Sequence, residues 1–288
     1  MRFGFNMTYN IDGFLIKLSN NHRLPKYQRL FPMYDRFVPY LGELADIHRK
    51  RCVDDSNRGV IIDIGANVGD TLAAIIKHTE DNIICIEPVP QYYRLLVDNI
   101  ASMGNEYRDR VTTSNIFVGS NDVDNHVYEC KYGTAHMVET DHKSDISTLS
   151  LETIISCNDV CPKKLDIIKV DTDGFDAQCI MSIGELLKDI DPLIFWENMI
   201  EDDSQYNSYC ELALFLDENG YTDFYIFDNF GNLLIKTDTC GLKSVNDYLV
   251  RIRHKHSGRS FYYVDVLAIK NNCQAYQDVI DSYLSTFR

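Results

Sequence analysis

The chain has 288 residues, 45% of them hydrophobic, which suits one large domain or one domain with an added arm. Its 28 basic and 43 acidic residues give a net charge of −15. This balance argues against nucleic acid or an anionic membrane surface as the main partner. No run approaches the ~20 apolar residues of a membrane span, so we expect no transmembrane segment.

The first ten residues, "MRFGFNMTYN", lack the apolar core of a secretory signal, so export is not expected. The nine cysteines are odd in number and show no paired spacing, which fits a reducing compartment. Cys157 and Cys161 form a CxxxC pair, but a zinc site would need two further ligands at a matching spacing. We therefore expect a cytoplasmic protein without structural zinc.

Residues 1–58 differ from the rest and are predicted to form an N-terminal arm. The stretch "FNMTYNIDGFLIKLS" alternates in polarity and predicts a hairpin with Asp12-Gly13 at its turn. The following residues predict helical pieces broken at Pro25, Pro32 and Pro39. The aromatic residues of this stretch are expected to pack on the main domain; they are Tyr27, Phe31, Tyr34, Phe37 and Tyr40.

Residues 59–288 are predicted to form one α/β domain. Seven strand-like segments occur in it: "VIIDI", "NIICIE", "RVTTSNIFV", "KLDIIKVD", "PLIFWEN", "TDFYIFD" and "SFYYVDVLAIK". Most are almost wholly apolar and alternate with amphipathic helical segments. This pattern predicts a mostly parallel, seven-stranded, Rossmann-like sheet with helices on both faces.

A polar insertion, residues 120–146, separates the third strand from the fourth. A loop of this length in a compact domain is usually functional, so we interpret it as an acceptor loop. It contains Tyr128, Tyr132, His136 and His142. His136 is a candidate general base, although a lone loop histidine is more often a surface residue.

The turn "DIGANVG" after the first of these strands predicts a ligand site, because such sheets bind ligands at the carboxyl ends of their strands. A dinucleotide site would need G-x-G-x-x-G, but Asn67 stands at the second glycine position. Asp63 and Asp70 add negative charge, which would repel a pyrophosphate and favour a cationic ligand. S-adenosylmethionine, which carries a sulfonium, an ammonium and no phosphate, explains the turn better than NAD.

Glu87 ends the next strand, about twenty residues after the glycine turn, where a carboxylate can bind both ribose hydroxyls. Pro88 and Val89 then offer an apolar wall for adenine. NAD enzymes share a glycine turn and an acid at this distance, so this pair alone is only moderately specific. A buried strand that ends in a solvated glutamate is the other interpretation of Glu87.

The chain resembles the FkbM family of class I S-adenosylmethionine-dependent methyltransferases. The resemblance rests on "VIIDIGANVGDT" (60–71), "IEPVP" (86–90) and "LDIIKVDTDGFD" (165–176), with Asp173 and Asp176 where the family usually has glutamate. It implies methyl transfer to oxygen, most often on a sugar or polyketide hydroxyl. It also implies a cofactor site around the glycine turn and the second strand, made by Asp63, Gly65, Ala66, Asn67, Gly69, Thr71, Glu87, Pro88 and, near adenine, Ser120.

The acceptor side is expected at the ends of the fourth and fifth strands, where Asp171 and the Glu197-Asn198 pair lie. This set is similar to the magnesium site of catechol O-methyltransferases and could hold Mg²⁺ through oxygen ligands. Alternatively, Asp171 or Asp173 is the general base without a metal. Lys169 is expected on the same strand face as Asp171, as a second candidate base or as its ion-pair partner.

The preferred hypothesis is a sugar O-methyltransferase that acts on a bacterial surface polysaccharide or on its nucleotide-linked or lipid-linked precursor. The basic stretch "RIRHKHSGR" (251–259) could anchor a phosphate of such an acceptor, or form a solvated face. The alternatives are a natural-product methyltransferase, an NAD-dependent oxidoreductase and a non-catalytic protein of the same fold. The oligomeric state stays open, a homodimer included.

Overall fold

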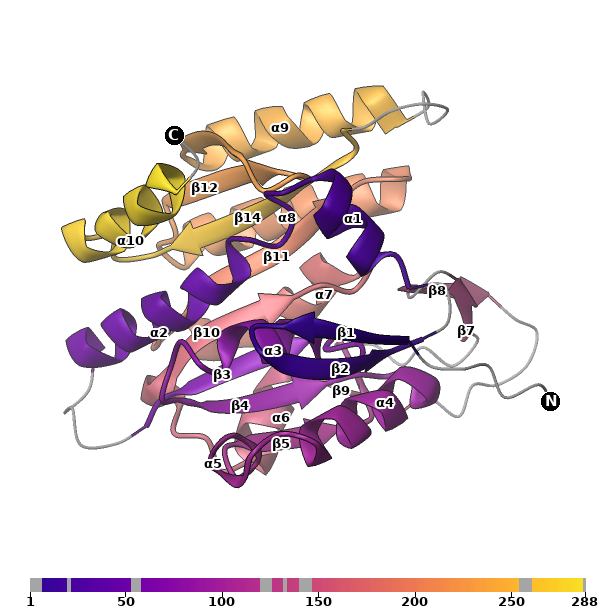
Figure 1. Ribbon diagram of the computed structural model, residues 1–288. Helices are drawn as coiled ribbons and strands as arrows, with labels where there is room; N and C mark the ends of the chain where they lie inside the picture. The colour runs from indigo at the N-terminus through magenta and orange to yellow at the C-terminus, as the bar shows by residue number, and fades with distance from the viewer. Residues whose placement is uncertain are drawn as a thin grey trace.

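The computed structural model describes residues 7–19, 22–52, 58–119, 126–131, 134–139, 147–253 and 261–286 (Figure 1). For residues 52, 126–131 and 134–139 it describes the backbone alone. Ser120, Tyr132, His142 and Arg259 lie outside the described residues, and for Tyr128 and His136 only the backbone is described. The roles expected of their side chains therefore stay predictions.

The centre of the molecule is a mixed, mostly parallel sheet of eight strands in the order β13-β12-β14-β11-β10-β3-β4-β5. Strand β14 runs antiparallel to both of its neighbours, and β13 is antiparallel to β12. The strands are β3 (Val60–Ile64), β4 (Asn82–Ile86), β5 (Val111–Ser114), β10 (Leu165–Val170), β11 (Leu193–Met199), β12 (Asp223–Asp228), β13 (Leu233–Thr237) and β14 (Tyr263–Ile269).

The predicted α/β class is confirmed, with one strand more than the seven expected. The additional strand, β13, lies at the sheet edge, and its residues are partly or largely exposed. The apolar run that marks a buried strand is therefore weak in this segment.

Helices cover both faces of the sheet because neighbouring strand residues alternate sides. Ile61 belongs to one core and Ile62 to the other. The first core packs against α2 (Val38–Cys52), α3 (Asp70–Ile75), α4 (Pro90–Ala101) and α10 (Gln274–Ser285). The second packs against α6 (Leu151–Cys157), α7 (Asp176–Met181), α8 (Asp203–Glu218) and α9 (Thr239–Ile252). A short helix, α5 (Asn105–Arg108), precedes β5.

The N-terminal arm begins with the predicted hairpin, formed by β1 (Met7–Ile11) and β2 (Phe14–Leu18). Asp12 and Gly13 both have positive φ, as a tight two-residue turn requires. The hairpin lies over α3 and α4 in Figure 1, and its buried residues join the first core. The arm therefore packs directly on the sheet domain.

Two of the three prolines in the arm have a different effect from the one predicted. Pro25 and Pro39 lie in the first turns of α1 (Leu24–Leu30) and α2, where a helix tolerates proline because the N–H of that turn has no intrahelical partner. Pro32 follows the end of α1. The aromatic Phe37 packs as expected, with its ring 4.4 Å from that of Phe227.

Part of the insertion forms an antiparallel hairpin, β7 (His126–Lys131) and β8 (Thr134–Glu139). It follows β6 (Phe117–Val118), which pairs with β9 (Thr148–Leu149). Figure 1 shows the hairpin on the side of the molecule where the parallel strands end.

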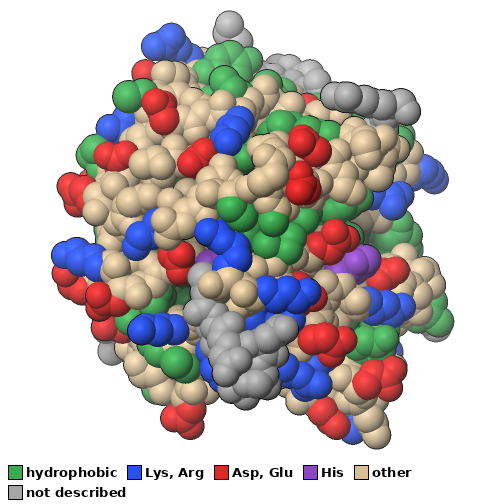
Figure 2. Space-filling model, turned by 90° about the vertical axis from the view of Figure 1, so that its left-hand side faces the viewer, with side chains coloured by type: hydrophobic (Ala, Val, Ile, Leu, Met, Phe, Trp, Pro, Cys, Tyr) green, Lys and Arg blue, Asp and Glu red, His purple; other side chains and the backbone are tan. Residues whose placement is uncertain are grey.

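The opposite side of the molecule, seen in Figure 2, carries interspersed positive and negative side chains. No helix in the described part of the chain combines the length and the hydrophobicity needed to cross a membrane.

Candidate active site

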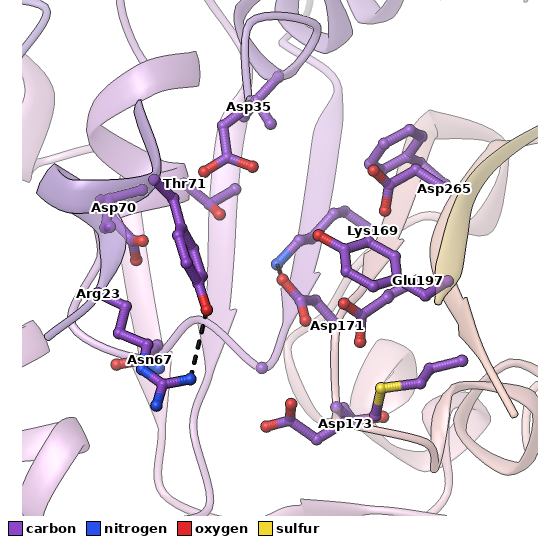
Figure 3. A pocket seen from close by; sticks show the side chains of 18 of the residues that line it. Arg23, Asp35, Asn67, Asp70, Thr71, Lys169, Asp171, Asp173, Glu197 and Asp265 are labelled. Carbon is purple, nitrogen blue, oxygen red and sulfur yellow. Dashed lines mark hydrogen bonds and ion pairs between the residues drawn. The ribbon is translucent and has the colours of Figure 1, made fainter. Parts of the chain in front are cut away.

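A cavity of about 790 Å³ opens at the carboxyl ends of the parallel strands. The turn after β3, the end of β4, the loop after β10 and the end of β11 contribute to it, as predicted for ligand sites of such sheets. The arm supplies a further wall, which includes Arg23, Tyr27, Tyr34 and Asp35. Figure 3 shows Asp35 projecting toward the same space as Asp171 and Asp265.

The glycine turn is held in shape by backbone contacts. Gly65 and Ala66 donate hydrogen bonds to the carbonyl of Ile86, at 2.9 and 3.0 Å. Gly65 has a φ of 79°, and a Cβ there would lie 1.8 Å from the carbonyl oxygen of Asp171. Only glycine therefore fits at residue 65, because the turn after β3 touches the loop after β10.

The carboxylate of Glu87 joins the glycine turn to the end of β4. Its two oxygens accept hydrogen bonds from the backbone N–H groups of Asn67, at 2.8 Å, and Val89, at 2.7 Å. Burial raises the pKa of Glu87 to about 7, although both hydrogen bonds act in the opposite direction. Each carboxylate oxygen keeps a second lone pair, so Glu87 can still accept hydrogen bonds from two ribose hydroxyls.

The expected cofactor residues separate into two groups. Those that line the cavity are Gly65, Asn67, Thr71, Glu87 and Pro88. Asp63, Ala66 and Gly69 were also expected in the cofactor site, but they do not line the cavity, and Asp63 and Ala66 are each 1% exposed. The physical reason is that Asp63 belongs to β3 itself, and Gly69 begins α3 below the turn.

Lys169 forms an ion pair with each of two carboxylates. Its Nζ lies 3.1 Å from Asp63 Oδ1 and 3.5 Å from Asp171 Oδ2. Although burial alone would lower the pKa of Lys169, Asp63 and Asp171 raise it above its ordinary value. A permanently charged ammonium cannot accept a proton, so the geometry favours the predicted ion-pair role over the predicted role as a base.

Further carboxylates lie close to this ion pair in the cavity (Figure 3). Glu197 on β11 lies directly opposite Asp265 on β14 in the antiparallel ladder. Burial, together with the negative charge of Asp171, raises the pKa of Glu197 well above its ordinary value. Burial and the charges of Asp35 and Asp171 do the same to Asp265.

The expected magnesium ligands do not come together. Asn198 is 1% exposed, and its amide contacts Trp196 and Asn246 in the second core. Because successive strand residues point to opposite faces, Asn198 faces away from the cavity that Glu197 lines. The described residues also contain no group of three His, Cys, Asp or Glu side chains that could hold a metal ion. The set of Asp171, Glu197 and Asn198 therefore does not fit Mg²⁺.

The two aspartates that replace family glutamates occupy different environments. Asp173 lines the cavity and has a φ of 52°. Asp176 is fully buried and accepts hydrogen bonds from the Thr172 hydroxyl, at 2.9 Å, and the Gly174 N–H, at 3.3 Å. Asp176 therefore closes the loop after β10, whereas Asp173 lies at the cavity wall.

The described part of the basic stretch binds acidic neighbours. Arg253 lies 2.7 Å from Asp203, and Arg251 lies 4.0 Å from Asp247. Neither arginine lines the cavity. Residues 254–260 lie outside the described residues, so a phosphate anchor at 251–259 stays a prediction.

Sequence reasoning missed several residues that line the cavity, above all Asp35 and Asp265. For Asp265 a signal was present, because a carboxylate interrupts the otherwise apolar strand "YYVDVLAI". Asp35 gave no comparable signal, since its position depends on how the arm folds back. Tyr27 and Tyr34, which were assigned to packing, also line the cavity.

The site fits S-adenosylmethionine by its chemistry. Glu87 would hold the ribose, carboxylates such as Asp70 would favour the sulfonium and ammonium, and Val89, Tyr92 and Phe117 would offer apolar surface for adenine. With the strand order and the glycine turn, these features define a class I methyltransferase that depends on S-adenosylmethionine.

The comparison with protein families makes the assignment more specific. Residues 63–222, more than half of the chain, match the methyltransferase FkbM domain, and the chain belongs to this family. No curated protein matches the sequence.

Solved structures resemble the chain only distantly. The precorrin-6y C5,15-methyltransferase of Geobacter metallireducens is 13% identical, with a TM-score of 0.37 over 80% of this chain and 88% of that one. TYW2 of P. horikoshii is 15% identical, with a TM-score of 0.39 over 92% and 72%. TrmK of M. capricolum is 11% identical, with a TM-score of 0.40 over 81% and 68%. Similarities this low carry no information about the acceptor.

Proposed function

We propose that the protein transfers a methyl group from S-adenosylmethionine to a hydroxyl of a sugar, in a bacterial surface polysaccharide or its precursor. The observation that supports an oxygen acceptor is the pair of carboxylates, Asp171 and Glu197, which line the cavity at the ends of the neighbouring strands β10 and β11, beside the glycine turn. A sugar hydroxyl is a weak acid and needs a base, and these carboxylates provide one. The aromatic rings and carboxylates of the cavity also suit stacking and hydrogen bonding to a sugar.

When bound, S-adenosylmethionine supplies the methyl group on an activated sulfonium. The chain has to hold the acceptor oxygen within ~3–3.5 Å of that carbon and remove its proton. Asp171 is our candidate base: it lines the cavity, its side chain is 51% exposed, and Lys169 fixes its orientation. Asp173 and Glu197 are placed to position the acceptor, and they are the next candidates for the base.

The first test is isothermal titration of S-adenosylhomocysteine, with NADH as the control ligand. We expect micromolar binding of S-adenosylhomocysteine and none of NADH, because Asn67 occupies the position where a pyrophosphate needs glycine. Absence of S-adenosylhomocysteine binding would overturn the proposal, and binding of NADH would favour the oxidoreductase hypothesis.

The second test is transfer of a labelled methyl group from S-adenosylmethionine to a panel of methyl glycosides. Asp171→Asn should lower the rate about 10²–10⁴-fold with little change in cofactor affinity, as expected for loss of a general base. Glu211→Gln changes the charge by the same amount on the exposed face of α8 and should leave the rate unchanged. An Asp171→Asn variant with the normal rate would refute the assignment of the base.

A further inference from the structure

The cavity has far more carboxyl groups than the cofactor can neutralise. Eight of the described residues that line it have a carboxyl group: Asp35, Asp70, Glu87, Asp171, Asp173, Glu197, Glu201 and Asp265. Two have a permanently charged cation, Arg23 and Lys169. S-adenosylmethionine adds one net positive charge, from a sulfonium, an ammonium and a carboxylate. A large excess of carboxyl groups therefore remains for the second ligand.

Two of these carboxyl groups lie on β11 and β14, which are two and three strands away from β3 in the sheet. In the sheet register, Phe227 on β12 pairs with Asp265 on β14, which pairs in turn with Glu197 on β11. Like charges directly opposite each other destabilise a sheet. Glu197 and Asp265 have no ion pair with a described residue, and Glu197 Oε2 is inaccessible to solvent without a hydrogen-bond partner there. Without a cation, burial and neighbouring negative charges raise the pKa of both carboxyl groups, and a cationic ligand would offset these effects.

Aromatic rings adjoin these carboxylates. Phe227 lies beside Asp265 in the register, and its ring is 4.4 Å from that of Phe37. Tyr34 and Tyr263 also line the cavity. Aromatic faces next to carboxylates are the environment in which proteins bind ammonium groups, through ion pairing and cation–π contacts.

We propose that the acceptor carries a protonated amino group, which Glu197 and Asp265 bind while a hydroxyl of the same molecule faces Asp171. Within the proposed function, on which this inference rests, the acceptor is an amino sugar with a free amine. A neutral sugar would leave the two carboxylates uncompensated, and an acylated amine would bring no charge. A phosphate in this part of the cavity would be repelled.

The test uses the full chain and three matched probes: methyl α-glucosaminide, methyl α-glucoside and the N-acetylated glucosaminide. Each is titrated calorimetrically into protein saturated with S-adenosylhomocysteine, at several pH values around neutrality, because the amine has to be protonated while the carboxyl groups are ionised. We expect the glucosaminide to bind at least about tenfold more tightly than the other two probes, as a charge-assisted contact predicts. Equal affinity for the three, tighter binding of a neutral probe, or no binding of the glucosaminide would overturn the inference.

Two isosteric variants test which carboxylates cause the preference for the glucosaminide. Asp265→Asn and Glu197→Gln should each remove most of the preference for the glucosaminide, whereas Glu211→Gln on the surface of α8 should keep it. Retained S-adenosylhomocysteine binding shows that each variant is folded, and either variant suffices if the other fails to fold. A preference that persists in a folded variant would overturn the role of that carboxylate. Failure of the wild-type chain to bind S-adenosylhomocysteine would instead overturn the proposed function itself.

Discussion

The contact between the glycine turn and the loop after β10 gives a prediction that compares two alanine variants. Gly65 and Gly69 both have positive φ, 79° and 86°, so alanine costs ~1–2 kcal/mol at either position. The surroundings differ. A Cβ on Gly65 would lie 1.8 Å from the backbone oxygen of Asp171, whereas on Gly69 it would lie 2.9 Å from a terminal methyl group of Leu96. A side-chain end can rotate away, but a backbone carbonyl cannot.

Gly65→Ala should therefore lose a further ~1–3 kcal/mol of stability from overpacking and displace the loop that carries Asp171. We expect its affinity for S-adenosylhomocysteine to fall at least about tenfold, which corresponds to 1.4 kcal/mol. Gly69→Ala should show only the conformational cost and bind within about threefold of the wild type. Urea denaturation measures the stability and calorimetry the affinity. Equal losses of affinity in the two variants would refute the reasoning, because Gly69 does not line the cavity.

Three further predictions concern buried charged and polar groups. The pKa of Glu87 rises from 4.5 to about 7 on folding, so the native state binds more protons in that window. Glu87 should therefore lower the free energy of unfolding by up to ~3 kcal/mol as pH rises from 4.5 to 7, and Glu87→Gln should reduce the slope in urea denaturation by this amount, while Asp176, whose pKa burial raises to about 7, keeps its own contribution; an unchanged slope contradicts the prediction. Lys169→Met leaves Asp63 buried without its ion pair and should lower the free energy of unfolding by ~3–5 kcal/mol. Adding Asp63→Asn should recover part of this loss. An unchanged melting temperature in Lys169→Met would be inconsistent with the ion pair. Because Asn198 faces the core, millimolar Mg²⁺ should not raise the melting temperature of EDTA-treated protein, and a clear increase would show a metal site.

Much of the fold could be predicted because the parallel strands are buried on both faces. Continuous apolar runs such as Val60–Ile64 mark them in the sequence. β13 was not predicted because it is an edge strand with a strand neighbour on one side only. Its apolar residues are largely exposed, Leu234 by 53% and Ile235 by 45%, so the segment lacks the pattern of a buried strand. The hairpin at Asp12 and Gly13 was predictable because its turn chemistry is local.

The candidate site was predictable only where its residues lie close together along the sequence. Glu87 and the glycine turn are separated by a fixed spacing along two neighbouring strands, so the sequence places them together. The prediction that Asn198 faces the cavity was wrong. Which face of the sheet Asn198 lies on depends on the alternation of residues along β11, and a strand of consecutive apolar residues does not reveal that alternation. Asp35 and Asp265 come from segments about 230 residues apart, and only the folded arm brings both to one cavity.

The distribution of left-handed residues supports the view that the arm belongs to the site. Five described residues other than glycine have positive φ, and three of them, Asp35, Asn67 and Asp173, line the cavity. They come from the arm, the turn after β3 and the loop after β10. Such conformations cost energy and persist where the surrounding structure determines them, commonly at ligand sites. One residue from each of these three segments is held in this way around a single cavity. The arm therefore forms part of the cavity wall and is more than an appendage of the sheet domain.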